Sequence, residues 1–380
     1  MTMSNTRSDR SLMADRSRTA TRTFKVAIAS AGHRAHYIEW FRDALARLGL
    51  PGEVIALEYR TTSASFLVAD RAVAMPAYND QAYAGAMRSW FAAERPDLLL
   101  SFVDYEQAVL ATGLGDELRA GGCNVLVLDS DSLATVCDKA AMAAALREHG
   151  VAAPDTYLGS QARRLAAEAP TEAEHVVKHR FGSGSSGLRM VRTAELEAAV
   201  ADVAITALDM FGHSSGGDLD HVVVQERVHG NEYGVDGVFS IDGRGTFLGA
   251  LARRKLRMRS GDTELATTVD PGPFDDLVRR VGEAIQPNGP VDMDVIVAAD
   301  GTPHLIDINP RFGGGYPFVH LAGADVPTLV VRLAAGLGPD PALLSYETGV
   351  ASVRREAFEV VSRSAAPWRS AGGSTSAGAS

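Results

Sequence analysis

A β-hairpin is predicted by the segment Pro290-Val-Asp-Met-Asp-Val-Ile-Val-Ala-Ala-Asp-Gly-Thr-Pro-His-Leu-Ile-Asp-Ile-Asn309. Its centre, Asp300-Gly301, is a strong two-residue turn signal, and apolar residues alternate on both sides of it. With these two residues as the loop, Ala299 pairs with Thr302, and this pairing sets the register of the whole hairpin.

Four polar side chains share one face of this hairpin. The register places Asp294 opposite Asp307 and Asp292 opposite Asn309, and strand alternation points all four to the same side. Two carboxylates directly opposite each other have Cβ atoms about 5 Å apart and destabilise a hairpin unless a cation lies between them. Oxygen ligands without imidazole favour magnesium or manganese. We therefore predict a Mg²⁺ site, with Mn²⁺ as the second choice of metal; a solvated polar sheet face is the other interpretation.

A glycine-rich stretch lies upstream, Gly182-Ser183-Gly184-Ser185-Ser186-Gly187, and it matches the pattern GxGxxG. A dinucleotide-binding fingerprint continues into a helix and a Walker A loop ends in Gly-Lys-Ser/Thr, whereas the residues from Leu188 onward predict a strand. Protein kinases also cover ATP with a hairpin, but their HRD and DFG motifs are missing here. We expect a hairpin tip whose backbone N–H groups fold over phosphates as a mobile lid, with Lys178 on the incoming strand. A hairpin that is only flexible is the alternative.

A short linker follows the apolar strand predicted over 222–225. The residues Gln225-Glu226-Arg227-Val228 close this strand and lead through a Gly-Asn turn to Glu232. A ligand can lie across exposed backbone at such a strand end, where acidic side chains can accept hydrogen bonds from ribose hydroxyls or an exocyclic amine. An ordinary surface turn is the other interpretation.

A dense basic run, Arg-Arg-Lys-Leu-Arg-Met-Arg, occupies residues 253–259. Strand alternation predicts Arg253, Lys255, Arg257 and Arg259 on one face. No aromatic residue is interleaved for base stacking, so the run favours an anion pocket over a nucleic-acid surface. We expect Lys255 and Arg257 to contact a substrate carboxylate and phosphates, unless the run is simply a solvated strand.

The pattern of predicted elements changes near residue 150. Before it, strands and helices alternate, which indicates an α/β domain with a parallel sheet; after it, hairpin signals indicate an α+β part with antiparallel sheets. We predict strands over 25–30, 54–57, 98–102, 124–128, 175–178, 188–191, 222–225, 233–240 and 246–251, and helices over 34–48, 83–93, 105–120, 132–148, 195–210, 274–285 and 327–335.

These elements divide the chain into successive units. The expected units are a disordered tail (1–23), an α/β domain (24–130), an α+β domain with two antiparallel-sheet lobes (131–340), a C-terminal extension (341–368) and a flexible tail (369–380). Within the second domain we expect a linker helix (132–150), a lid subdomain (about 155–228) and a C-terminal lobe (about 229–340).

Composition excludes several classes of function. Of the 380 residues, 46% are hydrophobic and 22% are charged, which is ordinary for a folded protein. The net charge of -10 argues against a nucleic-acid partner, and no apolar run approaches the ~18 residues of a membrane span. The Arg-rich residues 1–22 contain no apolar core of a secretory signal, and Cys123 and Cys137 form neither a disulfide framework nor a zinc motif. We expect a cytoplasmic protein with reduced thiols and no membrane partner.

Taken in chain order, these motifs resemble the ATP-grasp superfamily, in particular its carbamoyl-phosphate-synthase-like and biotin-carboxylase-like carboxylate–amine ligases. The resemblance spans about 24–337. The stretches Ala29-Ser-Ala-Gly-His-Arg34 and Asp104-Tyr-Glu106 are similar to the pre-ATP-grasp domain of these proteins. The stretches Cys137-Asp-Lys139 and Gly150-Val-Ala-Ala-Pro154 resemble the helix and turn that follow it.

The resemblance implies a role for each motif residue. It assigns Lys139 and Lys178 to the ATP phosphates, Gly182–Gly187 to the phosphate lid, Gln225, Glu226 and Val228 to adenine, Glu232 to ribose, Asp294, Asp307 and Asn309 to Mg²⁺, and Arg311 to the transferred phosphoryl group. The second metal carboxylate of the family is usually glutamate, so aspartate at both positions here implies a shorter reach.

The implied activity is ATP-dependent amide or peptide bond formation through an acyl phosphate, with release of ADP and phosphate. The implied substrates are a small-molecule carboxylate and an amine, on an amino acid, a small peptide or a specialised metabolite, and the implied assembly is a homodimer. The alternative is an ATP-binding regulatory or assembly protein of the same fold that has lost turnover.

Overall fold

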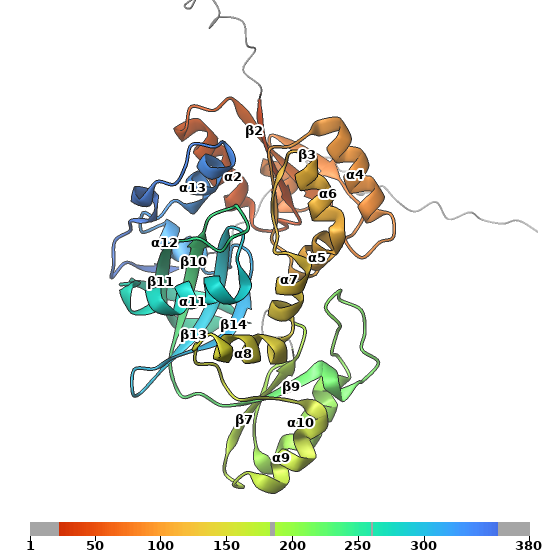
Figure 1. Ribbon diagram of the computed structural model, residues 1–380, viewed down its shortest axis with the longest axis vertical. Coiled ribbons are helices and arrows are strands. Elements are labelled where there is room, and N and C mark those ends of the chain that lie inside the picture. The colour runs from red at the N-terminus through yellow and green to blue at the C-terminus, as the bar shows by residue number, and fades with distance from the viewer. Residues whose placement is uncertain (1–22, 183–186, 260, 356–380) are drawn as a thin grey trace, which may run out of the picture.

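The computed structural model describes residues 23–182, 187–259 and 261–355, and Figure 1 shows their arrangement. A parallel sheet with its helices forms one end of the molecule, a small antiparallel sheet forms the other, and a large antiparallel sheet lies between them and to one side. The predicted tails fall outside the described residues, apart from residue 23. No helix in the described ranges is long and apolar enough to cross a membrane.

The N-terminal part is an α/β unit with a five-stranded parallel sheet, as predicted, in the order β3-β2-β1-β4-β5. Alternate residues of one strand enter different cores: Ala27 packs in the core that contains Met87, whereas Val26 and Ile28 pack with Phe41. Both faces are therefore buried, which explains the continuous apolar strands. The strands are β1 (Phe24–Ala29), β2 (Gly52–Glu58), β3 (Arg71–Ala74), β4 (Leu98–Ser101) and β5 (Asn124–Leu126). The helices are α2 (Ala35–Arg47), α3 (Ala64–Val68), α4 (Tyr83–Glu94), α5 (Asp104–Val109), a π-type turn (Leu110–Leu114) and α6 (Gly115–Ala120).

The linker predicted as one helix over 132–148 is two helices, α7 (Ser130–Cys137) and α8 (Lys139–Glu148). Asp138 breaks them apart because its backbone is extended and its carboxylate accepts the backbone N–H of Ala140 at 3.0 Å. The same carboxylate pairs with Arg180 at 2.8 Å. Capping by Asp138 makes Lys139 the first residue of α8, which directs the lysine toward the centre of the molecule.

The smaller antiparallel sheet has the order β6-β9-β7-β8 and its own hydrophobic core. Two helices cover one face of it (Figure 1). The predicted helix over 195–210 ends early, at Ala204. The elements are β6 (Thr156–Leu158), α9 (Ala162–Glu168), β7 (Glu174–His179), β8 (Arg189–Arg192), α10 (Leu196–Ala204) and β9 (Val222–Glu226).

The large antiparallel sheet has the order β14-β13-β10-β11-β12-β15. Its two faces share hydrophobic cores with the N-terminal domain, through α11 on one side and α13 on the other. The last strand lies in the predicted C-terminal extension and adds to the sheet beside β12. The elements are β10 (Gly230–Phe239), β11 (Phe247–Arg259), β12 (Asp262–Val269), α11 (Asp275–Ile285), β13 (Pro290–Ala298), β14 (Pro303–Asn309), α12 (Tyr316–His320), α13 (Val326–Ala334) and β15 (Ala351–Val353).

The β13–β14 hairpin forms, but its loop is longer than predicted. The N–H of Ala298 donates to the carbonyl of Thr302 at 3.0 Å, so three residues form the loop in place of two. A bulge at Ile306 compensates for the extra residue. Asp294 therefore still lies opposite Asp307, as the two-residue loop had predicted, although the pairs nearer the turn are shifted by one residue.

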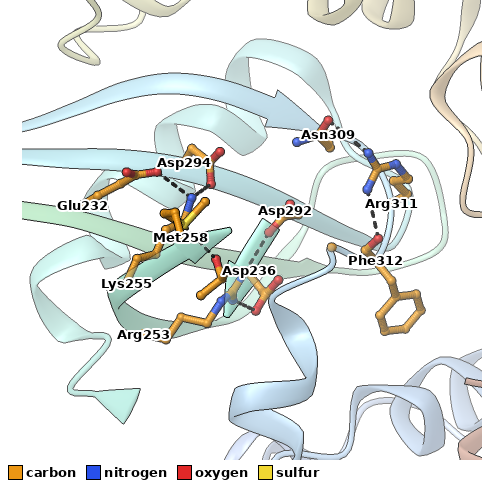
Figure 2. A network of polar contacts seen from close by, with 12 residues as sticks. Glu232, Asp236, Arg253, Lys255, Met258, Asp292, Asp294, Asn309, Arg311 and Phe312 are labelled. Carbon is orange, nitrogen blue, oxygen red and sulfur yellow. Dashed lines mark hydrogen bonds and ion pairs between the residues drawn. The ribbon is translucent and has the colours of Figure 1, made fainter. Parts of the chain in front are cut away.

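A buried charge cluster lies at the centre of the large sheet (Figure 2). Arg253, with 1% of its side chain exposed, donates from Nη2 to Asp292 at 2.8 Å and from Nη1 to Asp236. The loop after β14 covers it so closely that a Cβ on Gly315 would lie 2.3 Å from the Arg253 guanidinium. Burial raises the pKa of Asp236 to about 7, and the neighbouring Asp292 carboxylate adds to this while Arg253 opposes it.

Replacing Arg253 by methionine leaves two buried carboxylates without a cation. We expect the free energy of unfolding of Arg253→Met to fall by about 3–5 kcal/mol in urea titrations near neutral pH. Folding then favours the protonated carboxyl, and a raised folded-state pKa makes stability fall as pH increases. The loss is therefore expected to be larger at about pH 8 than at about pH 5.

The matched control is Arg254→Met, which removes the exposed arginine that follows on the same strand. Its stability should stay within about 0.5 kcal/mol of the parent. Equal losses in the two variants would show that the buried cluster does not stabilise the sheet.

Candidate functional site

A cleft of about 590 Å³ lies between the small sheet, the large sheet and the N-terminal domain. This volume is in the range of about 300–1,000 Å³ that is typical of ligand pockets. Most of the predicted site residues line it: Lys139, Lys178, Gly182, Gln225, Glu226, Val228, Glu232, Lys255, Asp294, Asp307, Asn309 and Arg311.

Lysine is rare in this chain and concentrated in the cleft. The sequence contains only four lysines, Lys25, Lys139, Lys178 and Lys255, and the last three line the cleft. Nearly all other cations are arginines. Because an ammonium group is a compact point charge that suits phosphate oxygens, this placement favours an anion site.

Lys139 projects from the start of α8 toward the hairpin carboxylates. Its Nζ lies 3.2 Å from Oδ1 of Asp307 and donates to the carbonyl of Gly182. Lys139 thus links α8, β14 and the glycine-rich stretch. Of the predicted lid, Ser183, Gly184, Ser185 and Ser186 lie outside the described residues.

Lys178 is a buried cation on β7. Its Nζ donates to the carbonyl of Ile306 at 3.1 Å, the residue at the bulge of β14. Within the described ranges Lys178 makes no ion pair. Burial lowers its pKa to about 8, while the negative charge of Asp307 partly opposes this shift.

Lys255 lies between two carboxylates (Figure 2). Its Nζ is 2.7 Å from Glu232 and 2.6 Å from Asp294, and only 5% of its side chain is exposed. Burial lowers the pKa of Lys255, but the two carboxylates outweigh burial and the net pKa is raised. Burial also raises the pKa of Asp294 to about 6, with the like charges of Asp292 and Asp307 adding to the effect and Lys255 opposing it.

The predicted metal residues Asp294, Asp307 and Asn309 come together at the end of the hairpin. No group of three His, Cys, Asp or Glu side chains in the described part of the chain is arranged to hold a metal by itself. The donors here are instead two carboxylates and one amide, and each carboxylate contacts a lysine. Such hard oxygen donors fit Mg²⁺ that keeps water and phosphate oxygens as its other ligands.

Arg311 joins the large sheet to the N-terminal domain. Its Nε and Nη2 donate to the two carboxylate oxygens of Asp104 at 2.6 and 2.7 Å. Its Nη2 also lies 3.2 Å from Oδ1 of Asn309, and its Nη1 lies 3.2 Å from the carbonyl of Phe312. Burial lowers the pKa of the guanidinium, but the charge and hydrogen bonds of Asp104 outweigh burial and the net pKa is raised. Arg311 therefore remains charged. Asp104 therefore positions Arg311 beside the metal residues.

The prediction that alternate residues of the basic run share one face is wrong beyond Lys255. The register of β11 against β12 shifts between Lys255 and Arg257, so strict alternation ends there. Arg257 turns away from the cleft and pairs with Glu264 at 2.6 Å, while Met258 lines the cleft instead. We do not include Arg257 in the candidate site.

The predicted adenine linker lies at one end of the cleft. Gln225 is buried, and its Nε2 donates to the hydroxyl of Thr156 at 2.9 Å, so this side chain braces the small sheet. Glu226 is exposed at the cleft, and Val228 lines it. Gly187, at the far end of the glycine-rich stretch, has a φ of +66°.

Sequence reasoning assigned no role to two residues at the site, Arg34, which lines the cleft, and Asp104, which holds Arg311. Both Asp104 and Arg34 were noted as parts of motifs without a role of their own, although both follow the carboxyl ends of parallel strands. That edge of an α/β sheet is where ligands bind, and this signal could have found them.

Comparisons with known proteins agree with this geometry. Residues 218–356 match the family described as "ATP-grasp in the biosynthetic pathway with Ter operon", and residues 26–126 match the "PylC-like, N-terminal domain". Residues 218–356 therefore form an ATP-grasp domain, and residues 26–126 a PylC-like N-terminal domain. These matches confirm the predicted ATP-grasp resemblance, and the similar fold of solved structures confirms the predicted fold class. A comparison with curated proteins gave no match.

Several solved structures have a similar fold. Biotin carboxylase from Campylobacter jejuni, in a β-γ-ATP complex, has a TM-score of 0.67 and 16% identity, covering 86% of this chain and 74% of that one. The biotin carboxylase domain of Hydrogenobacter thermophilus 2-oxoglutarate carboxylase, with MgADP and bicarbonate, has a TM-score of 0.64 and 18% identity, covering 83% of this chain and 70% of that one. L-amino acid ligase from Bacillus licheniformis has a TM-score of 0.59 and 18% identity, covering 82% of this chain and 74% of that one.

The environment of Lys178 predicts an unusual titration. With only four lysines in the chain, reductive ¹³C-methylation gives few NMR signals, and one of them should titrate near pH 8 because burial disfavours the ammonium form. Lys178→Arg should remove that signal, whereas Lys25→Arg should leave it in place. A spectrum in which every lysine titrates above about pH 9.5 would contradict the burial of this charge.

Proposed function

We propose that this protein is an ATP-dependent carboxylate–amine ligase that forms an amide or peptide bond through an acyl phosphate. The observation that carries the proposal is the convergence of three lysines, three oxygen donors and Arg311 on one cleft. Phosphoryl transfer needs positioning and charge neutralisation more than a covalent nucleophile, and this set supplies both. The similar fold of L-amino acid ligase and of biotin carboxylase in nucleotide complexes supports it.

In this proposal the nucleotide lies along the cleft. Adenine lies against the linker residues Glu226 and Val228, with Glu232 near the ribose, and the phosphates lie between Lys139 and Lys178. Burial depresses the pKa of Lys178. Phosphates that bind beside it would favour its protonated form, because opposite charges stabilise each other.

The first step is attack of a substrate carboxylate oxygen on the γ-phosphorus. The bond between this phosphorus and the β–γ bridging oxygen breaks, ADP leaves, and a carboxyl phosphoric anhydride forms. Arg311, held by Asp104, faces the negative charge on the transferred phosphoryl group. Asp294, Asp307 and Asn309 would hold Mg²⁺, which neutralises charge on the phosphate oxygens when bound.

In the second step the nitrogen of an amine attacks the acyl carbon. The C–N bond forms, the bond from the acyl carbon to the phosphate oxygen breaks, inorganic phosphate leaves, and the nitrogen loses a proton. We propose an amino acid, a small peptide or a specialised metabolite as the source of the amine or the carboxylate.

The products distinguish this ligase from a silent ATP-binding protein. Purified protein with ATP, Mg²⁺ and a panel of carboxylates and amines should release ADP and phosphate, because the carboxylate takes the γ-phosphoryl group. Hydroxylamine should trap the acyl phosphate as a hydroxamate without the natural amine. Release of AMP and pyrophosphate would mean adenylation, and tight ATP binding without any ADP release would favour a regulatory protein.

Asp307→Asn tests the proposed metal residues. The change removes one charged ligand but keeps an oxygen that Lys139 can contact, so the fold should persist in circular dichroism. We expect Mg²⁺-dependent ADP release to fall about 100-fold or more. Asp300→Asn, at the exposed turn of the same hairpin, is the matched control and should keep full turnover. Equal turnover in both variants would exclude Asp307 from the site.

A further inference from the structure

Arg34 is a cleft residue with unused hydrogen-bonding capacity. It follows the turn after β1, begins α2, and lines the same cleft as Arg311 and Gly314. Its side chain makes one weak polar contact, from Nη1 to the carbonyl of Phe102 at 3.4 Å, and its Cζ lies 5.8 Å from the Phe102 ring. In residues 23–182, 187–259 and 261–355, Arg34 forms no ion pair.

Arg311 provides the comparison. It directs N–H groups to both oxygens of Asp104, to Asn309 and to the Phe312 carbonyl, which occupies four of the five donors of a guanidinium. Arg34 uses one donor of five. Arg34 therefore keeps the donors needed to bind a carboxylate in a bidentate geometry, and unlike Arg227, which pairs with Glu174 at 3.0 Å, its charge has no ion-pair partner among the described residues.

The position of Arg34 is unfavourable for the protein alone. A cation at a helix N-terminus opposes the helix dipole, and the first turn of α2 contains no acidic residue to offset it. Burial lowers the pKa of the Arg34 guanidinium, the nearby positive charge of Arg311 lowers it further, and Asp104 and Asp262 oppose this only in part. An anion from outside the chain would remove this imbalance.

In the proposed function, Lys139 and Lys178 bind the phosphates of the nucleotide. Lys139 and Lys178 approach the cleft from α8 and β7, whereas Arg34 comes from the N-terminal domain. An anion on Arg34 must therefore belong to a second ligand in the same cleft.

We propose that Arg34 binds a carboxylate of the amino-acid substrate through a bidentate contact. This inference rests on the proposed function and names the chemical class of a substrate that the cleft selects. The carboxylate is either the one that is phosphorylated or the free carboxylate of the amine-bearing substrate.

Binding without turnover tests the proposal directly. Isothermal titration would measure each proteinogenic L-amino acid, and the C-terminal amide of every one that binds, against protein saturated with Mg²⁺ and AMPPNP. We expect Arg34→Gln to weaken the acid about 10- to 100-fold, since a charge-assisted contact is lost, and to leave the amide unchanged. Arg34→Lys keeps the charge without the fork and should be intermediate.

Arg60→Gln is the matched control, because Arg60 is an exposed arginine just after β2 at the same edge of the sheet. It should bind like the parent. Arg34→Gln should also melt no lower than the parent, because no ion pair is lost. The proposal is overturned if no amino acid binds the parent or if Arg34→Gln binds the amino acid as tightly as the parent does. It is also overturned if Arg34→Gln loses affinity for AMPPNP as well as for the amino acid.

Hydroxamate formation separates the two sources of the carboxylate. A loss of hydroxamate in Arg34→Gln assigns Arg34 to the carboxylate that is phosphorylated. Normal hydroxamate with reduced amide formation assigns it to the amine-bearing substrate. Failure of the ligase proposal is distinct: the parent then yields no ADP, whereas the titrations still report on Arg34.

Discussion

The buried pairing of Arg253 with Asp236 and Asp292 organises the large sheet and everything attached to it. These charges come from three adjacent strands, and without one another each would be an unpaired ion in the sheet centre. Their close packing requires glycine in the loop that crosses them, because a Cβ at Gly313 would lie 2.1 Å from the Asp292 carboxyl carbon. The loop that carries Arg311 into the cleft is thus shaped by the cluster beneath it.

The cleft has charges of both signs in contact. Lys139 pairs with Asp307, and Lys255 bridges Glu232 and Asp294, so the carboxylates that would repel one another are separated by ammonium groups. This arrangement explains how two aspartates can face each other on adjacent strands in a stable sheet. It also holds the groups that would meet phosphates and Mg²⁺ in place through ion pairs before either arrives.

The N-terminal domain is an integral part of the site. Its sheet shares hydrophobic cores with the large sheet on both faces, and Asp104 holds Arg311 across the boundary between them. The small sheet, in contrast, has a separate core, and its links to the rest include Lys178 with the carbonyl of Ile306 and Arg180 with Asp138. Substrate recognition by Arg34 would therefore be rigidly coupled to the position of Arg311.

The sequence by itself determined the hairpin, its acidic face and the alternation of strands and helices, because these depend on local periodicity and turn chemistry. The ATP-grasp assignment came from the resemblance of its motifs to those of a known family. Tertiary structure decided the bulge at Ile306, the break at Asp138 and the outward turn of Arg257. The first two depend on partners far along the chain, Lys178 for the bulge carbonyl and Arg180 for the capping carboxylate, and the third depends on the shifted register against the neighbouring strand β12. The same holds for Arg34, whose unused donors become visible only when the domains are brought together around one cleft.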